Sequence, residues 1–147
     1  GRGLGILKLT PTLDLVAGVV YLDRIDVSLL PAGGIHYRPN DIWEFYAVFP
    51  SPRVTRRLPS SSELEFNWFV AGEYGGGSWT ANRAGLDDRF DYNDLRVTTG
   101  FEWRSPTGRS GSIELGYVFD RELIFDSGTP GPSTVDDTFL FRAGIDL

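Results

Sequence analysis

The sequence has no cysteine and no methionine, and it has a single lysine, Lys8, and a single histidine, His36. The absence of cysteine excludes disulfides and thiolate chemistry. One histidine without cysteine makes a zinc site unexpected. His36 lies between a glycine turn and a proline turn with no nucleophile that the sequence places beside it, so we do not expect it to be catalytic. Since position 1 is not methionine, we expect a mature or trimmed product from which any signal peptide has already been removed.

Long hydrophobic runs and net positive charge are also missing. The longest apolar run, residues 15–22, is about eight residues long, whereas a membrane helix needs roughly 20. A membrane β-strand needs only about 9–11 residues, so the sequence does not exclude a protein that crosses the membrane with β-strands. The net charge of −6, from 14 basic and 20 acidic residues, argues against nucleic acid as a partner.

Alternation of apolar and polar residues is the dominant pattern, and the last ten residues show it most clearly. Phe139, Phe141, Ala143, Ile145 and Leu147 share one face of residues 138–147, and a period of two indicates a β-strand. Other alternating segments are residues 12–22, 42–49, 63–74, 90–104 and 111–123. No segment has a sustained helical period, and 18 glycines and 9 prolines supply frequent turns. We therefore predict one all-β domain over residues 1–147, an antiparallel up-and-down β-barrel of about 8–10 strands.

The two faces of the predicted strands differ in chemistry. Charged residues of both signs share one face, where we expect an ion network that fills the barrel interior: Arg96, Glu102, Arg104, Glu114, Asp120 and Arg142. Aromatic residues share the other face, which we expect outside, against lipid or another subunit: Phe101, Trp103, Tyr117, Phe119, Phe139 and Phe141. A membrane barrel carries its apolar face outside, whereas a soluble protein buries it, and alternation alone does not distinguish the two. The charges and the aromatic residues near strand ends favour the membrane arrangement.

A hairpin around Pro106 predicts a register for two of these strands. If Arg104 lies opposite Ser112, then Glu102 lies opposite Glu114 and Arg96 lies opposite Asp120. Glu102 beside Glu114 would match the carboxylate spacing of a retaining glycosidase, but a charge-balanced interior is the favoured interpretation.

Three further segments admit a binding interpretation. Gly75, Gly76 and Gly77 lack the lysine and helix of a phosphate loop, so we expect a bend or a close approach of strands. The segment 87–94 is predicted to be an acidic loop that could bind calcium weakly, although a solvated loop is favoured; its oxygen ligands would be Asp87, Asp88, Asp91, Asn93 and Asp94. Arg53, Arg56 and Arg57 could bind lipid phosphates or could simply protect an edge strand from mispairing.

Several stretches together resemble a planctomycete-type family of predicted bacterial outer-membrane β-barrels whose function is not established. They are Tyr21-Leu22-Asp23-Arg24, Leu30-Pro31-Ala32-Gly33-Gly34, Val48-Phe49-Pro50-Ser51-Pro52-Arg53, Gly72-Glu73-Tyr74-Gly75-Gly76-Gly77-Ser78-Trp79 and Gly116-Tyr117-Val118-Phe119-Asp120-Arg121. The apolar end of the last strand also resembles the C-terminal signal of bacterial outer-membrane barrels, with leucine where phenylalanine is usual. Members of the family have further strands before the position of Gly1. The resemblance therefore implies either a smaller barrel or edges that pair with another copy.

These patterns predict a non-catalytic outer-membrane-type barrel with a structural role, located in the bacterial outer membrane or on the cell surface. Its expected partners are outer-membrane lipid or further copies of itself, with no cofactor and no nucleic acid. The alternative is a self-assembling extracellular subunit whose barrels pair or stack into a tube or filament, and a soluble carbohydrate-active β protein is third. We expect the final strand to be paired along both edges, with the segment 111–123 on one side. The other partner is the N-terminal strand if the strand count is even, and another copy if it is odd.

Overall fold

The computed structural model describes residues 1–22, 24, 28–60, 63–83, 85–128 and 131–146. Leu147, the predicted last residue of the final strand, lies outside the described residues. The strands are β1 (Arg2–Thr10), β2 (Leu13–Tyr21), β3 (Leu29–Tyr37), β4 (Trp43–Phe49), β5 (Arg53–Leu58), β6 (Glu65–Arg83), β7 (Leu86–Arg104), β8 (Ser110–Phe125), β9 (Ser133–Val135) and β10 (Thr138–Asp146). The predicted all-β, antiparallel, up-and-down fold is confirmed, and so is the number of strands.

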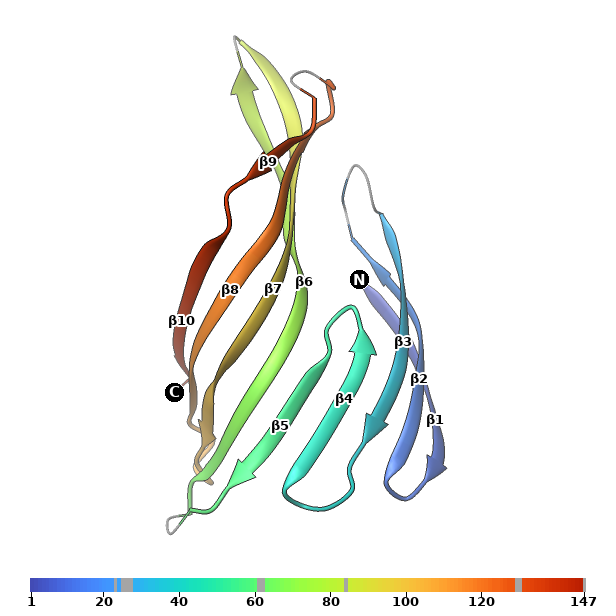
Figure 1. Cartoon of the computed structure of the whole chain (residues 1–147), viewed down its shortest axis with the longest axis vertical. Coiled ribbons are helices and arrows are strands. Elements are labelled where there is room, and N and C mark those ends of the chain that lie inside the picture. Colours follow the sequence, from blue (N-terminus) through green and yellow to red (C-terminus); the bar gives the residue numbers. More distant parts are fainter. Residues whose placement is uncertain (23, 25–27, 61–62, 84, 129–130, 147) are drawn as a thin grey trace.

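The strands form one sheet in the order β1-β2-β3-β4-β5-β6-β7-β8-β10, and short β9 pairs with the far end of β8. Each strand is antiparallel to the next, as short turns require. The sheet is strongly curved, with β6, β7 and β8 rising well above the short β4–β5 hairpin (Figure 1). No helix long and apolar enough to cross a membrane occurs among the described residues.

The hairpin of β6 and β7 corrects two sequence predictions. Both strands are 19 residues long and pair from Glu65↔Arg104 to Arg83↔Leu86. The glycines at 75–77 therefore lie within a continuous strand rather than at a bend. Residues 87–89, expected only in a loop, belong to β7 together with residues 90–94, which the alternation of 90–104 also predicts as strand. At Gly76 the backbone has φ 112°, a left-handed conformation that favours glycine, and the strand continues through it.

The β7–β8 hairpin differs from its predicted register by two residues. Arg104 lies opposite Ser110, Glu102 opposite Ser112, and Arg96 opposite Val118. The cause is a shorter turn, since Ser105 already donates its backbone N–H to the carbonyl of Arg109. A shift of two residues keeps every side chain on its predicted face. It also means that Glu102 and Glu114 are not opposed, so the predicted glycosidase-like pair is wrong: Glu114 lies opposite Gly100.

The two faces of the sheet have opposite exposure. We call the concave face that carries Asp14, Arg96 and Glu114 the inner face, and the face that carries Leu15, Leu115 and Phe141 the outer face. The buried apolar side chains lie on the inner face among the charged ones: Val16, Ala32, Val48, Phe69 and Val118. The curvature of the sheet buries them, and the outer face stays open.

Both edges of the sheet are unpaired in the part of the chain that the structure describes. β1 pairs with β2 alone and β10 pairs with β8 alone. Pairing of β10 with the segment 111–123 is thus confirmed. Of the two alternatives for its other edge, the described sheet does not pair β10 with the N-terminal strand of the same chain. The physical reason is strand parity. Pro11 lies in the turn between β1 and β2 and splits the first segment in two, so eight antiparallel steps lead from β1 to β10 and the two edges run in the same direction.

Candidate functional site

An ion cluster on the inner face joins four strands. Arg96 on β7 contacts Asp94 Oδ1 through Nε at 2.6 Å, and its Nη1 lies 3.7 Å from Glu73 Oε1 on β6. Arg142 on β10 contacts Glu73 Oε2 at 3.3 Å and Glu114 Oε1 on β8 at 2.7 Å. Two arginines thus alternate with three carboxylates. Asp94 is almost fully buried, so its charge depends on Arg96 for compensation.

Gly75 leaves the space in which the buried end of this cluster sits. It lies opposite Asp94 on the neighbouring strand. A Cβ at Gly75 would overlap the Asp94 carboxylate and the Arg96 guanidinium. The glycine-rich stretch is therefore a close-approach feature that admits an ion pair, rather than a bend.

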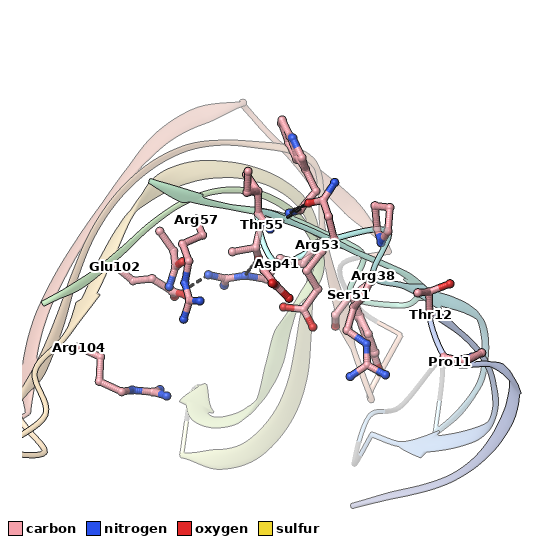
Figure 2. A pocket seen from close by; sticks show the side chains of 17 residues that line it. Pro11, Thr12, Arg38, Asp41, Ser51, Arg53, Thr55, Arg57, Glu102 and Arg104 are labelled. Atoms are coloured by element: carbon pink, nitrogen blue, oxygen red, sulfur yellow. Dashed lines mark hydrogen bonds and ion pairs between the residues drawn. The ribbon is translucent and has the colours of Figure 1, made fainter. Parts of the chain in front are cut away.

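A second part of the inner face is hollow. A cavity of about 1000 Å³ is lined by residues of β4 to β7 and of the turns that precede β2 and β4, with Arg53, Arg57, Glu102 and Arg104 on the inside of the curve (Figure 2). Arg53 Nη2 lies 2.6 Å from Glu102 Oε2, across the intervening β6, and the Arg53 guanidinium stacks on the Phe69 ring. Charges of both signs line this space, which suits a hydrated interior better than an apolar ligand.

His36 belongs to a third group on the same face. Its Nε2 lies 2.6 Å from Glu44 Oε1, and its Nδ1 lies 3.8 Å from Asp14 Oδ2. Arg38 contacts the same Asp14 oxygen at 2.9 Å, and the His36 ring packs edge-on against Tyr46. The histidine is one member of an ionic group, flanked by two carboxylates.

The predicted ion-network residues are distributed over these groups. Arg96, Glu114 and Arg142 come together through Glu73, and Glu102 pairs with Arg53 instead. Arg104 reaches the cavity but makes no ion pair among the described residues. Asp120 is exposed at a β-bulge opposite Asp94, with φ 51°, and it too has no ion pair in the described part of the chain.

The predicted aromatic residues lie on the outer face. Phe139 is 85% exposed and Phe141 66%, and Phe101 and Tyr117 are also exposed. Trp103 and Phe119 are half-buried, because the Trp103 ring covers Gly111 and Phe119 stacks on Tyr117. Strand alternation and register also place three of the four tryptophans on this face: Trp43, Trp68 and Trp103. The fourth, Trp79, is 51% exposed on the projecting part of β6.

The acidic residues proposed for calcium do not converge. A strand sends successive side chains to opposite sides, and the carboxylates have separate partners: Asp87 accepts from Asn82, Asp88 from Ser127, and Asp94 from Arg96. The described residues contain no group of three or more histidine or acidic side chains placed to hold a metal.

Arg24 makes a contact that sequence reasoning missed. Its Nη1 donates to Asn93 Oδ1 on β7 at 2.8 Å, and its guanidinium lies over the Tyr74 ring of β6. The arginine is buried and links the connection between β2 and β3 to the long β6–β7 hairpin, beyond the end of the short β4–β5 hairpin. Nothing in the local sequence indicates this, because the residues are 69 positions apart. The positions of Glu73 and Arg53 on the charged face could have been predicted from the alternation of their strands.

The fold and the site define a class: a curved antiparallel up-and-down sheet with an ionic inner face, an apolar outer face and two free edges. Comparison with protein-family models, with curated proteins and with solved structures found no match to this chain.

Proposed function

We propose that this chain forms the wall of an outer-membrane-type β-barrel with a structural, non-catalytic role. In this assignment the outer face contacts lipid and the inner face lines a hydrated, charged interior. The bacterial outer membrane is the location that this assignment implies.

The observation that carries the proposal is the inverted polarity of the sheet. Phe139 and Phe141 are the two largest exposed side chains of β10, while Asp14 and Asp94 on the inner face are 4% and 2% exposed. A soluble protein rarely exposes contiguous apolar patches larger than a few hundred Å². The outer face carries exposed apolar residues on at least seven of the strands: Leu7, Leu15, Ile35, Phe49, Phe101, Leu115 and Phe141. Hydrocarbon is the medium that would suit such a surface.

Strand lengths also support this assignment. β1, β2, β3 and β10 each have nine residues, which is close to the roughly 9–11 residues of a tilted membrane strand. β6 and β7, with 19 residues each, would extend to about 60 Å, so one end of this hairpin would project beyond the bilayer. That end carries the polar residues Asn82, Asp87 and Asp88, as a projecting tip requires.

The native tryptophans test the proposal without any substitution. The chain is reconstituted into phosphatidylcholine vesicles whose acyl chains carry bromine, and into matched vesicles without bromine. We expect bromine to quench the tryptophan emission strongly and aqueous acrylamide to quench it weakly. Emission that bromine leaves unchanged and acrylamide quenches would overturn the proposal.

A second candidate is a self-assembling extracellular subunit, and the two free edges favour it. An unpaired nine-residue strand presents backbone donors and acceptors that another strand can satisfy. In this case a neighbouring copy would cover much of the outer face, and filaments would appear in detergent-free preparations under the electron microscope.

A further inference from the structure

The free edges β1 and β10 run in the same direction, which limits how two copies can join. Suppose that two copies place their inner faces on the same side. Then β10 of one copy can lie beside β1 of the next only in parallel. The alternative is a two-fold arrangement, in which β10 lies antiparallel to β10 and β1 antiparallel to β1.

Charge argues against a two-fold joint between two copies of β1. Arg2 and Lys8 are the charged side chains of β1, and both lie on the inner face, opposite Val20 and Asp14 of β2. Antiparallel pairing of β1 with itself about Gly5 would bring Arg2 of one copy beside Lys8 of the other, and pairing about the central Ile6 would leave Lys8 beside Leu4 with no counter-charge. Like charges directly opposite are destabilising. β10, by contrast, ends at Asp146 on the inner face, and the segment before it contains Asp136 and Asp137.

One parallel register matches the two edges in charge. If Asp146 lies beside Lys8 of the next copy, the two form an ion pair on the inner face. Arg142 then lies beside Leu4, and Arg2 lies beside Leu140, so this register places no like charges directly opposite each other.

The same register also matches the two edges in side-chain size. On the outer face Phe139 and Phe141 lie beside Gly1 and Gly3 of the next copy, and Ile145 lies beside Leu7. On the inner face Gly144 lies beside Ile6. The chain already uses an aromatic ring over a cross-strand glycine, since Trp103 covers Gly111 on the adjacent strand. The space around Gly3 and Gly144 is open, with nothing within 4 Å of a Cβ built at either position.

We infer that β10 of one copy pairs in parallel with β1 of a second copy, in the register that places Asp146 beside Lys8. The joint is heterologous, so repeated joints close a ring of copies into one wall or continue as a filament. It extends the proposed function by naming the partner that completes the wall. The joint itself does not depend on lipid.

Because the chain has no native cysteine, a maleimide cross-linker reacts only with the cysteines that are introduced. Leu7→Cys and Ile145→Cys are prepared as separate full-length variants, both at exposed outer-face positions, and are mixed and treated with a short bismaleimide. We expect a dimer that contains one copy of each variant. The matched control mixes Leu7→Cys with Phe139→Cys, which lies on the same two strands but is six residues away, or about 20 Å. That mixture should give little product.

Three results would overturn the inference. Efficient dimers of either single variant alone would indicate the two-fold arrangement. A double variant that cross-links only within one chain would indicate that a single copy closes on itself. Equal yields from the test and control mixtures would mean that no specific joint exists, as expected if another segment covers β1. Cross-linking is measured with and without vesicles, so it tests the joint between copies independently of lipid. Bromine quenching tests the contact of the outer face with lipid, so either hypothesis can fail without the other.

Discussion

Arg142 on β10 lies 3.3 Å from Glu73 on β6, although β7 and β8 separate the two strands. The same guanidinium contacts Glu114, so one side chain connects three strands of the inner face. A contact of this kind is possible because the sheet curves around its charged face. It ties the C-terminal edge to the middle of the sheet.

Arg142→Ala should therefore lower the free energy of unfolding measurably. Arg142 and Glu73 are both about two-fifths exposed, so water screens their attraction and the expected loss is about 1 kcal/mol. Denaturant unfolding followed by tryptophan fluorescence measures it. Arg109→Ala, in the exposed β7–β8 turn, is the matched control and should change stability little. An equal effect of both substitutions would contradict a special role for Arg142.

Asp94→Ala should cost more, because it leaves a partly buried guanidinium without its closest counter-charge. The Asp94 side chain is 1% exposed and that of Arg96 18%. Breaking a buried pair by removing one partner costs roughly 3–5 kcal/mol. The double variant Asp94→Leu/Arg96→Met should recover most of this loss in a denaturant titration. If the double variant is no more stable than Asp94→Ala, the unpaired charge is not the cause.

Gly75→Ala should destabilise the sheet by about 1–3 kcal/mol, because a methyl group there overlaps the Asp94–Arg96 pair. Thermal unfolding compares it with Gly131→Ala, where nothing lies within 4 Å of the new Cβ. The control should remain within about 0.5 kcal/mol of the parent. Tolerance of alanine at Gly75 would show that the ion pair can be displaced at little cost.

Lys8→Glu should weaken assembly, since it places two carboxylates together at the proposed joint between copies. Asp146→Lys in the same chain should restore assembly by exchanging the charges. Sedimentation velocity or mass photometry at matched concentrations measures the change. Asp41→Lys, in the turn between β3 and β4 and away from both edges, is the control that changes the net charge by the same amount, with the opposite sign, without altering the joint. Assembly that responds equally to all three variants would contradict pairing of Lys8 with Asp146.

The sequence was sufficient to predict most of the strands and their faces, because alternation is local. Phe101, Glu102 and Trp103 fall on the expected sides even though the β7–β8 register is shifted by two residues, since a shift of two preserves the side. The register itself depended on the length of the turn at 105–109, which the residue types do not determine.

Side-chain contacts that span several strands could not be predicted from the sequence. Glu73 meets Arg142 only because the sheet curves, and curvature comes from the summed twist of many strands rather than from any one segment. The burial of Arg24 against Asn93 depends in the same way on how two distant hairpins are placed. The segment 87–94 was predicted to be a loop because its acidic composition is typical of loops. In the structure it pairs with β6 and is part of a strand.

The central claim, that the apolar face of the sheet is the outer, lipid-facing one, is tested most directly by a nitroxide scan along β8. Single cysteines are introduced from Ser112 to Val118 in the cysteine-free chain, labelled, and reconstituted into vesicles. Collision rates are then measured with oxygen, which concentrates in the bilayer, and with a water-soluble nickel chelate. We predict high oxygen accessibility at Ile113, Leu115 and Tyr117, and higher nickel accessibility at Ser112, Glu114 and Gly116. High nickel accessibility at Ile113, Leu115 and Tyr117, or accessibilities that do not alternate from one residue to the next, would contradict the account.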